Sequence, residues 1–154
     1  MSRRLKKQES KVKLSRENSD KSRGGNCEQL PTFSFVHLTN NKIYNFSYFR
    51  SSQEKERIEA KSKLYDRLEE ISSKEWSHWL MRRKENGGCE KFEFSRIGIK
   101  PTGIDLTGDE DIFIFRFDGA NNQGARILGF RKEKCPIYYI IGYDFNYSAY
   151  NHGS

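Results

Sequence analysis

The C-terminal part of the chain shows the clearest alternation of hydrophobic and polar positions. Its apolar runs are DIFIFRF (111–117), ARILGFR (125–131), PIYYIIGYD (136–144) and NYSAYNH (146–152). Glycines, asparagines and a short charged segment separate the first three runs, and residues of these types favour turns and loops. The pattern therefore predicts three consecutive antiparallel strands followed by a short fourth strand.

Two earlier segments also have a period of two. Aromatic side chains alternate along PTFSFVHLT (31–39) and KIYNFSYFR (42–50), with Asn40-Asn41 between them. Asparagine tolerates the positive φ of a tight hairpin, so we predict an N-terminal β-hairpin from Phe33 to Phe49. KFEFSRIGI, from Lys91 to Ile99, is predicted to form a further strand.

Between residues 51 and 71 the period of the apolar positions changes to about 3.6, which is typical of a helix. The helix is predicted from Gln53 to Ile71, with Ser51-x-x-Glu54 as its capping box. One stripe of side chains is expected to face the core: Ile58, Leu64, Tyr65, Leu68 and Ile71.

A second helix is predicted directly after the first. Ser72-x-x-Glu75 repeats the capping signature, and Trp76 and Trp79 lie one turn apart on the helix that follows. Asn86-Gly87-Gly88 is expected to end it, because glycine and asparagine accept the left-handed conformation beyond a helix.

The order of a hairpin, two helices and an antiparallel meander predicts an α+β fold. Residues 30–154 are long enough to form one α+β domain with its own core. Residues 1–29 contain no aromatic side chain, and their only sizeable aliphatics are Leu5, Val12 and Leu14. We therefore predict that residues 1–29 are a disordered tail.

The net charge of +7 is distributed unevenly along the chain. Residues 1–25 hold nine Lys or Arg and three acidic residues, whereas the remainder holds 19 and 18. The basic character therefore belongs to the tail, and polyanion binding by the body requires a local patch. No apolar run approaches the roughly 18 residues of a membrane span, so we expect a cytoplasmic protein without a membrane partner.

The sequence favours neither a metal nor a cofactor. Cys27, Cys89 and Cys135 lie far apart and form no Cys/His ligand pattern, so reduced thiols are expected. We find no nucleotide-binding glycine loop, HExxH motif or nucleophile elbow.

Arginines placed within apolar strands are the main candidate chemistry of the predicted sheet. A guanidinium is costly to bury unless it meets a carboxylate, a phosphate or water. Arg116 is expected to project from the open face of its strand, where it either pairs with an acid such as Asp144 or Asp118 or binds a phosphate. Arg126 and Arg131 alternate to opposite faces of the next strand.

The opposite face of the first strand carries three phenylalanines: Phe113, Phe115 and Phe117. We expect this face to pack against the helix pair and its tryptophans. At the C-terminal edge, Tyr150 and His152 are candidates for proton transfer or base stacking. The alternative is that they are amphipathic edge residues with hydrated polar groups.

These features together resemble the RelE/ParE-like toxin superfamily over about residues 51–152. The resemblance covers the two helices, the meander and a set of six positions: Arg126, Gly129, Arg131, Asp144, Tyr150 and His152. It is closest to uncharacterised relatives in bacteria and their phages.

RelE-like enzymes are ribosome-dependent, metal-free endoribonucleases, so the resemblance implies attack by a ribose 2′-hydroxyl on the adjacent phosphate. It implies Arg116, Arg126 and Arg131 as phosphate ligands and Tyr150 and His152 as acid/base groups. RNA or the ribosome and a small acidic antitoxin are the implied partners. ParE-like members act on gyrase instead, so the fold alone does not set the function.

A second hypothesis belongs to another functional class. Under it the chain is a non-catalytic accessory protein, for example of a phage, whose sheet domain binds a protein or nucleic acid. The basic tail would then supply a salt-dependent attraction to nucleic acid.

Overall fold

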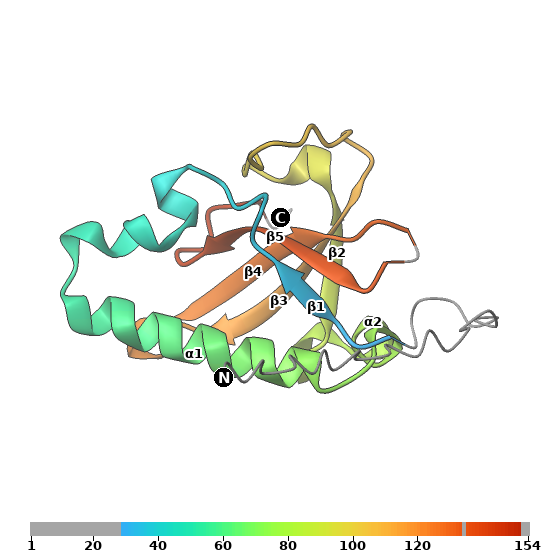
Figure 1. Cartoon of the computed structure of the whole chain (residues 1–154). Helices are drawn as coiled ribbons and strands as arrows, with labels where there is room; N and C mark the ends of the chain where they lie inside the picture. The colour runs from blue at the N-terminus through green and yellow to red at the C-terminus, as the bar shows by residue number, and fades with distance from the viewer. Residues whose placement is uncertain (1–28, 134, 152–154) are drawn as a thin grey trace, which may run out of the picture.

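The computed structural model describes residues 29–133 and 135–151. Over this range the chain has an α+β fold with a mixed sheet in the strand order β1-β5-β4-β3-β2 (Figure 1). The strands are β1 (Thr32–Ser34), β2 (Cys89–Glu93), β3 (Asp111–Asp118), β4 (Gly124–Phe130) and β5 (Ile137–Asp144). Strands β2 to β5 pair antiparallel in chain order, and β1 pairs parallel with β5. The predicted class and the three consecutive antiparallel strands are confirmed.

Two helices, α1 (Glu54–Ser72) and α2 (Trp76–Met81), cover one face of this sheet (Figure 1). The ring centroids of Trp76 and Phe113 lie 5.9 Å apart, as do those of Trp79 and Phe115. The helices therefore pack on the phenylalanine face of β3, as predicted. The indole of Trp79 donates to the carbonyl oxygen of Ile71 at 2.8 Å, which joins α2 to the end of α1.

The buried stripe of α1 differs from the predicted one. Leu64 and Ile71 are buried as expected, but Ile58 and Tyr65 are exposed, Tyr65 by 68%. Ala60 and Arg67 take the remaining buried positions. Arg67 can occupy a core position because its guanidinium finds hydrogen-bond acceptors there, a possibility that a hydropathy pattern does not register.

The predicted N-terminal hairpin is wrong. The segment forms one strand, β1, and its second half forms two 3-10 helices, η2 (Lys42–Tyr44) and η3 (Phe46–Ser51). The side chain of Asn41 accepts a hydrogen bond from the amide of Ile43, and that of Asn45 accepts one from Ser47. These asparagines therefore cap helical turns instead of bending a hairpin.

Several predicted element boundaries are also corrected. Gln53 and Glu75 are the N-cap residues of α1 and α2, and neither makes a side-chain capping bond, so both predicted capping boxes are wrong. Helix α2 ends at Met81, and a separate 3-10 turn, η4 (Lys84–Asn86), has Gly87 as its C-cap with a φ of 83°. The strand predicted over 91–99 forms only in part: β2 ends at Glu93, and the 3-10 turn η5 (Phe94–Arg96) follows it. No strand forms over residues 146–151, the described part of the predicted fourth run.

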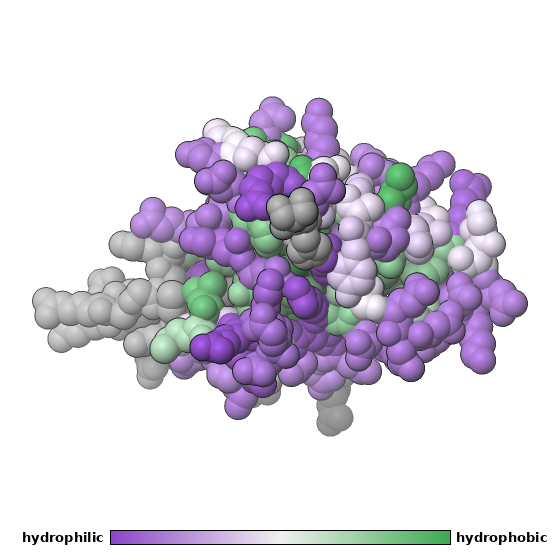
Figure 2. Space-filling view, turned by 180° about the vertical axis from the view of Figure 1, so that it is seen from behind, coloured by the Kyte–Doolittle hydropathy of each residue, from purple (hydrophilic) through white to green (hydrophobic). Residues whose placement is uncertain are grey.

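The second face of the sheet is covered as well, so the expectation of an open face is corrected. Ile97 and Ile99, from the connection between β2 and β3, pack there with Ala149 and Tyr150 from the C-terminal segment. They cover apolar side chains of the inner strands such as Ile114. The surface behind the view of Figure 1 is mainly hydrophilic, with small apolar patches among the charged side chains (Figure 2).

The predicted disordered tail, residues 1–29, lies outside the described residues except for Gln29. Across the described part of the chain, no helix is both long enough and apolar enough to cross a membrane.

Candidate functional site

Charged residues form a row across three strands on the face opposite α1. Arg116 of β3 lies opposite Arg126 of β4, and Arg126 lies opposite Asp144 of β5. Because side chains at paired positions share a face of the sheet, the register brings two of the three predicted arginines side by side.

Arg126 is held by a buried ion pair. Its Nη1 lies 3.1 Å from Oδ2 of Asp144, and the two side chains are 2% and 0% exposed. The same carboxylate accepts hydrogen bonds from the amides of Ser148 at 2.9 Å and Ala149 at 3.1 Å. The pair therefore ties the C-terminal segment to the sheet, and this burial leaves Arg126 no exposed edge for a ligand.

Two tyrosines of the C-terminal segment lie over Arg126. Its guanidinium carbon is 4.0 Å from the ring centroid of Tyr147 and 4.4 Å from that of Tyr150. Tyr150 is buried, and this burial raises the pKa of its phenol to about 12. Tyr150 therefore keeps its proton at neutral pH and cannot serve as the general base there.

Tyr147, in contrast, is 43% exposed and has a φ of 57°. Its hydroxyl occupies the space that a side chain on Gly124 would need. A glycine at this position of β4 thus allows the ring to lie against the strand.

Arg116, unlike the buried Arg126, reaches open space. Its Nε and Nη2 both lie 2.7 Å from Oε1 of Glu90, whose other oxygen is 3.9 Å from Nζ of Lys84. The side chain of Arg116 remains 39% exposed. Arg116 therefore pairs with an acid, which is one of its two predicted roles, but the acid is Glu90 and not Asp144 or Asp118. Glu90 lies on the neighbouring strand β2, on the same face.

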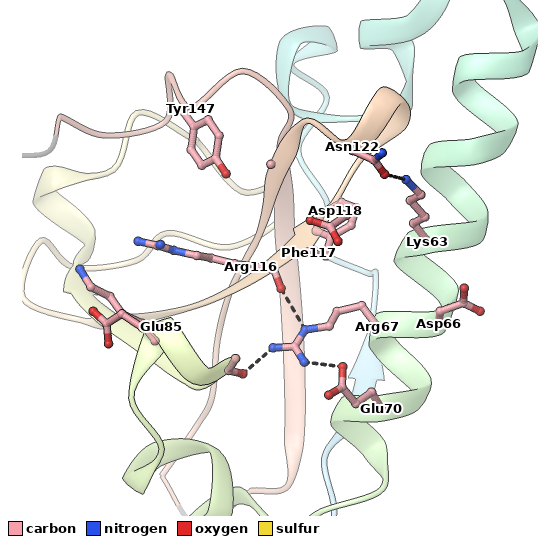
Figure 3. A pocket seen from close by; sticks show the side chains of 13 residues that line it. Lys63, Asp66, Arg67, Glu70, Glu85, Arg116, Phe117, Asp118, Asn122 and Tyr147 are labelled. Carbon is pink, nitrogen blue, oxygen red and sulfur yellow. Dashed lines mark hydrogen bonds and ion pairs between the residues drawn. The ribbon is translucent and has the colours of Figure 1, made fainter.

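Arg116 and Tyr147 line an open groove of about 700 Å³ between α1, η4 and the β3–β4 connection (Figure 3). Arg67 closes its floor, donating to the carbonyl oxygen of Arg116 at 2.9 Å, to Glu70 at 2.6 Å and to the carbonyl oxygen of Gly87 at 2.5 Å. The described lining includes four cationic and four acidic side chains: Lys63, Arg67, Lys84, Arg116, Asp66, Glu70, Glu85 and Asp118.

Arg131 lies apart from this groove. Its guanidinium carbon is 4.2 Å from the ring centroid of Trp76, under the helix pair, and it donates to the carbonyl oxygen of Cys135 at 3.3 Å. The predicted alternation of Arg126 and Arg131 is confirmed, so the three arginines do not converge. His152 lies outside the described residues.

The ion pairs at Arg116 involve two residues that the sequence did not single out as site candidates. Glu90 precedes the predicted strand by one residue, and Lys84 lies just before Asn86-Gly87-Gly88, the predicted end of the second helix. An acid such as Glu90 on the strand next to Arg116 could have been predicted as its partner, but only if the order of the strands were known.

The described cysteines and acids do not suggest another centre. Cys89 and Cys135 are free thiols, and burial raises the pKa of Cys89 to about 12, which disfavours a thiolate at neutral pH. Within residues 29–133 and 135–151, no group of three or more His, Cys, Asp or Glu side chains could hold a metal ion. Comparisons with protein families, curated proteins and solved structures find no match.

Proposed function

We propose that this chain is a toxin-like protein of the RelE fold that binds RNA in the groove beside Arg116. Two features support the proposal: the helix pair followed by an antiparallel meander, on which the sequence resemblance rests, and the residues that meet at the groove. Of the site residues predicted from the sequence, the proposed site keeps Arg116, and Tyr147 is added to it.

The observation that carries the proposal is the pairing of an exposed guanidinium with an exposed aromatic ring. Glu90 holds one edge of Arg116 through Nε and Nη2, which fixes the plane of the fork and leaves the Nη1 edge for a ligand. The side chain extends away from α1, between Tyr147 and Glu85 (Figure 3). An arginine suits a phosphate and a tyrosine ring suits a base, so one nucleotide could engage both.

The same groove holds the residue types that metal-free RNA cleavage needs. A carboxylate such as Glu85 or Asp118 would accept the proton of the 2′-hydroxyl as that oxygen bonds to phosphorus. Arg116 and Lys84 would stabilise the charge on the phosphate, and Tyr147 would protonate the departing 5′-oxygen. These residues would replace Arg126, Arg131 and Tyr150 in the roles that the resemblance implied.

A second candidate function is the binding of a protein segment in this groove. Among the described lining residues the cationic and acidic side chains are equal in number, which gives a polyanion little net attraction. A polypeptide of mixed charge could pair with both kinds. This candidate corresponds to the non-catalytic accessory protein considered from the sequence.

Expression in bacteria distinguishes the two candidates. If the proposal holds, the full chain arrests growth and cleaves ribosome-bound message, and Arg116→Ala lowers the cleavage rate by about a hundredfold because one charge-stabilising donor is lost. Arg96→Ala is the matched control, since Arg96 lies over the ring of Phe92, away from the groove. A wild-type chain that neither binds nor cuts RNA, or an Arg116→Ala chain as active as wild type, would refute it.

A further inference from the structure

A second groove lies on the other flank of α1, between its first turns and η3. It has a volume of about 660 Å³, and its polar lining is as follows: Ser47, Arg50, Ser52, Glu54, Arg57 and Lys61. We call it the η3 groove. It shares no lining residue with the groove at Arg116.

The charge of the η3 groove is unbalanced. Its described lining carries three cationic side chains and a single acid, Glu54. Glu54 lies 3.7 Å from Arg57 in an exposed pair, and such pairs contribute little, so a stronger anion could displace it. Within the described ranges, Arg50 and Lys61 take part in no ion pair.

The packing of the groove also positions its cations. Nζ of Lys61 lies 5.3 Å from the ring centroid of Phe46, so the ring attracts the ammonium group to the groove wall. Phe46 itself is fixed by Tyr143, at 5.1 Å between ring centroids, and by Phe145 at 5.5 Å. The wall is therefore anchored to β5 and to the residue that follows it.

From this arrangement we infer that the η3 groove binds the sugar–phosphate backbone of a nucleic acid. Arg50, Arg57 and Lys61 supply charge to phosphate oxygens, and the hydroxyls of Ser47 and Ser52 supply neutral donors of the kind that contact backbones. A concave site favours a chain that can enter it over a flat membrane surface. The inference does not rest on the proposed function, because it uses none of the residues at Arg116.

The salt dependence of binding to a single-stranded oligouridylate tests this site in the full chain. Replacing the three cations together, Arg50→Ala, Arg57→Ala and Lys61→Ala, is expected to reduce the slope of log affinity against log salt by about 2, because each phosphate contact on a single strand contributes about 0.7. Affinity at low salt should fall about tenfold or more. The basic tail is present in every variant, so its contribution cancels in the comparison.

The matched control removes three exposed cations elsewhere: Lys74→Ala, Arg83→Ala and Lys100→Ala. It lowers the net charge by the same amount, and its slope is expected to stay close to wild type. Equal losses in the two triple variants would overturn the inference, because they would show a dependence on net charge alone. A groove variant that loses binding to phosphatidylserine vesicles but keeps oligouridylate binding would also overturn it. Arg116→Ala reports separately on the other groove.

Discussion

At the scale of single residues, the arginines of the sheet region differ in their burial and in the groups that they contact. Arg126 is buried against Asp144, Arg131 lies over Trp76, and Arg67 satisfies three oxygen acceptors beneath α1. Arg116 keeps an exposed edge while Glu90 fixes the other. Strand alternation predicts the face of each arginine, but only the order of the strands reveals its partner.

The Arg126–Asp144 pair leads to a prediction about stability. Asp144→Ala should lower the free energy of unfolding by about 3–5 kcal/mol, because it removes the carboxylate that a buried guanidinium and two backbone amides share. Urea unfolding measures this. Asp111→Ala is the control, since it breaks the exposed pair with Lys91 and should cost about 1 kcal/mol or less. Equal losses in the two variants would contradict the structural role given to Asp144.

At the scale of elements, periodicity was sufficient for the long helix and for the three consecutive strands of the meander. Helix α1 and strands β3, β4 and β5 were predicted to within one residue at either end. The segment from Phe33 to Phe49 was not, because its aromatic rings distribute between two faces of the sheet. Tyr44 joins the core of one face and Phe46 packs against the core of the other, whereas a strand would place these two side chains on the same face.

Neighbouring residues on α1 test the corrected stripe. Leu64→Ala should destabilise the fold by about 2–5 kcal/mol, because Leu64 is 6% exposed and its loss leaves a cavity under the helix. Tyr65→Ala should change stability by about 0.5 kcal/mol or less, because its side chain faces solvent. Thermal unfolding of both variants gives the comparison. A larger loss in Tyr65→Ala would restore the stripe predicted from the sequence.

At the scale of the whole molecule, the covered second face sets where a ligand can bind. Side chains from the N-terminal segment, the β2–β3 connection and the C-terminal segment close most of it, and the two largest grooves among the described residues lie along the flanks of α1. The sequence predicted a site on the sheet face, and Arg116 did lie at its margin. It could not reveal the groove, which combines α1, η4 and Tyr147 from separate parts of the chain.

The two grooves differ in the net charge of their lining residues. The groove at Arg116 is balanced and holds an aromatic ring, whereas the η3 groove carries excess positive charge. The proposed roles are nucleotide binding for the groove at Arg116 and binding of a sugar–phosphate backbone for the η3 groove. Mapping where RNA touches the chain therefore addresses the central claim more directly than any change in overall affinity.

Photocrosslinking of a 4-thiouridine-substituted RNA to the full chain, followed by peptide mass spectrometry, supplies that map. The account predicts a crosslink at Tyr147 that disappears in Arg116→Ala, while the fold of the variant, checked by circular dichroism, stays intact. Crosslinks confined to other parts of the chain, with none at Tyr147, would contradict it.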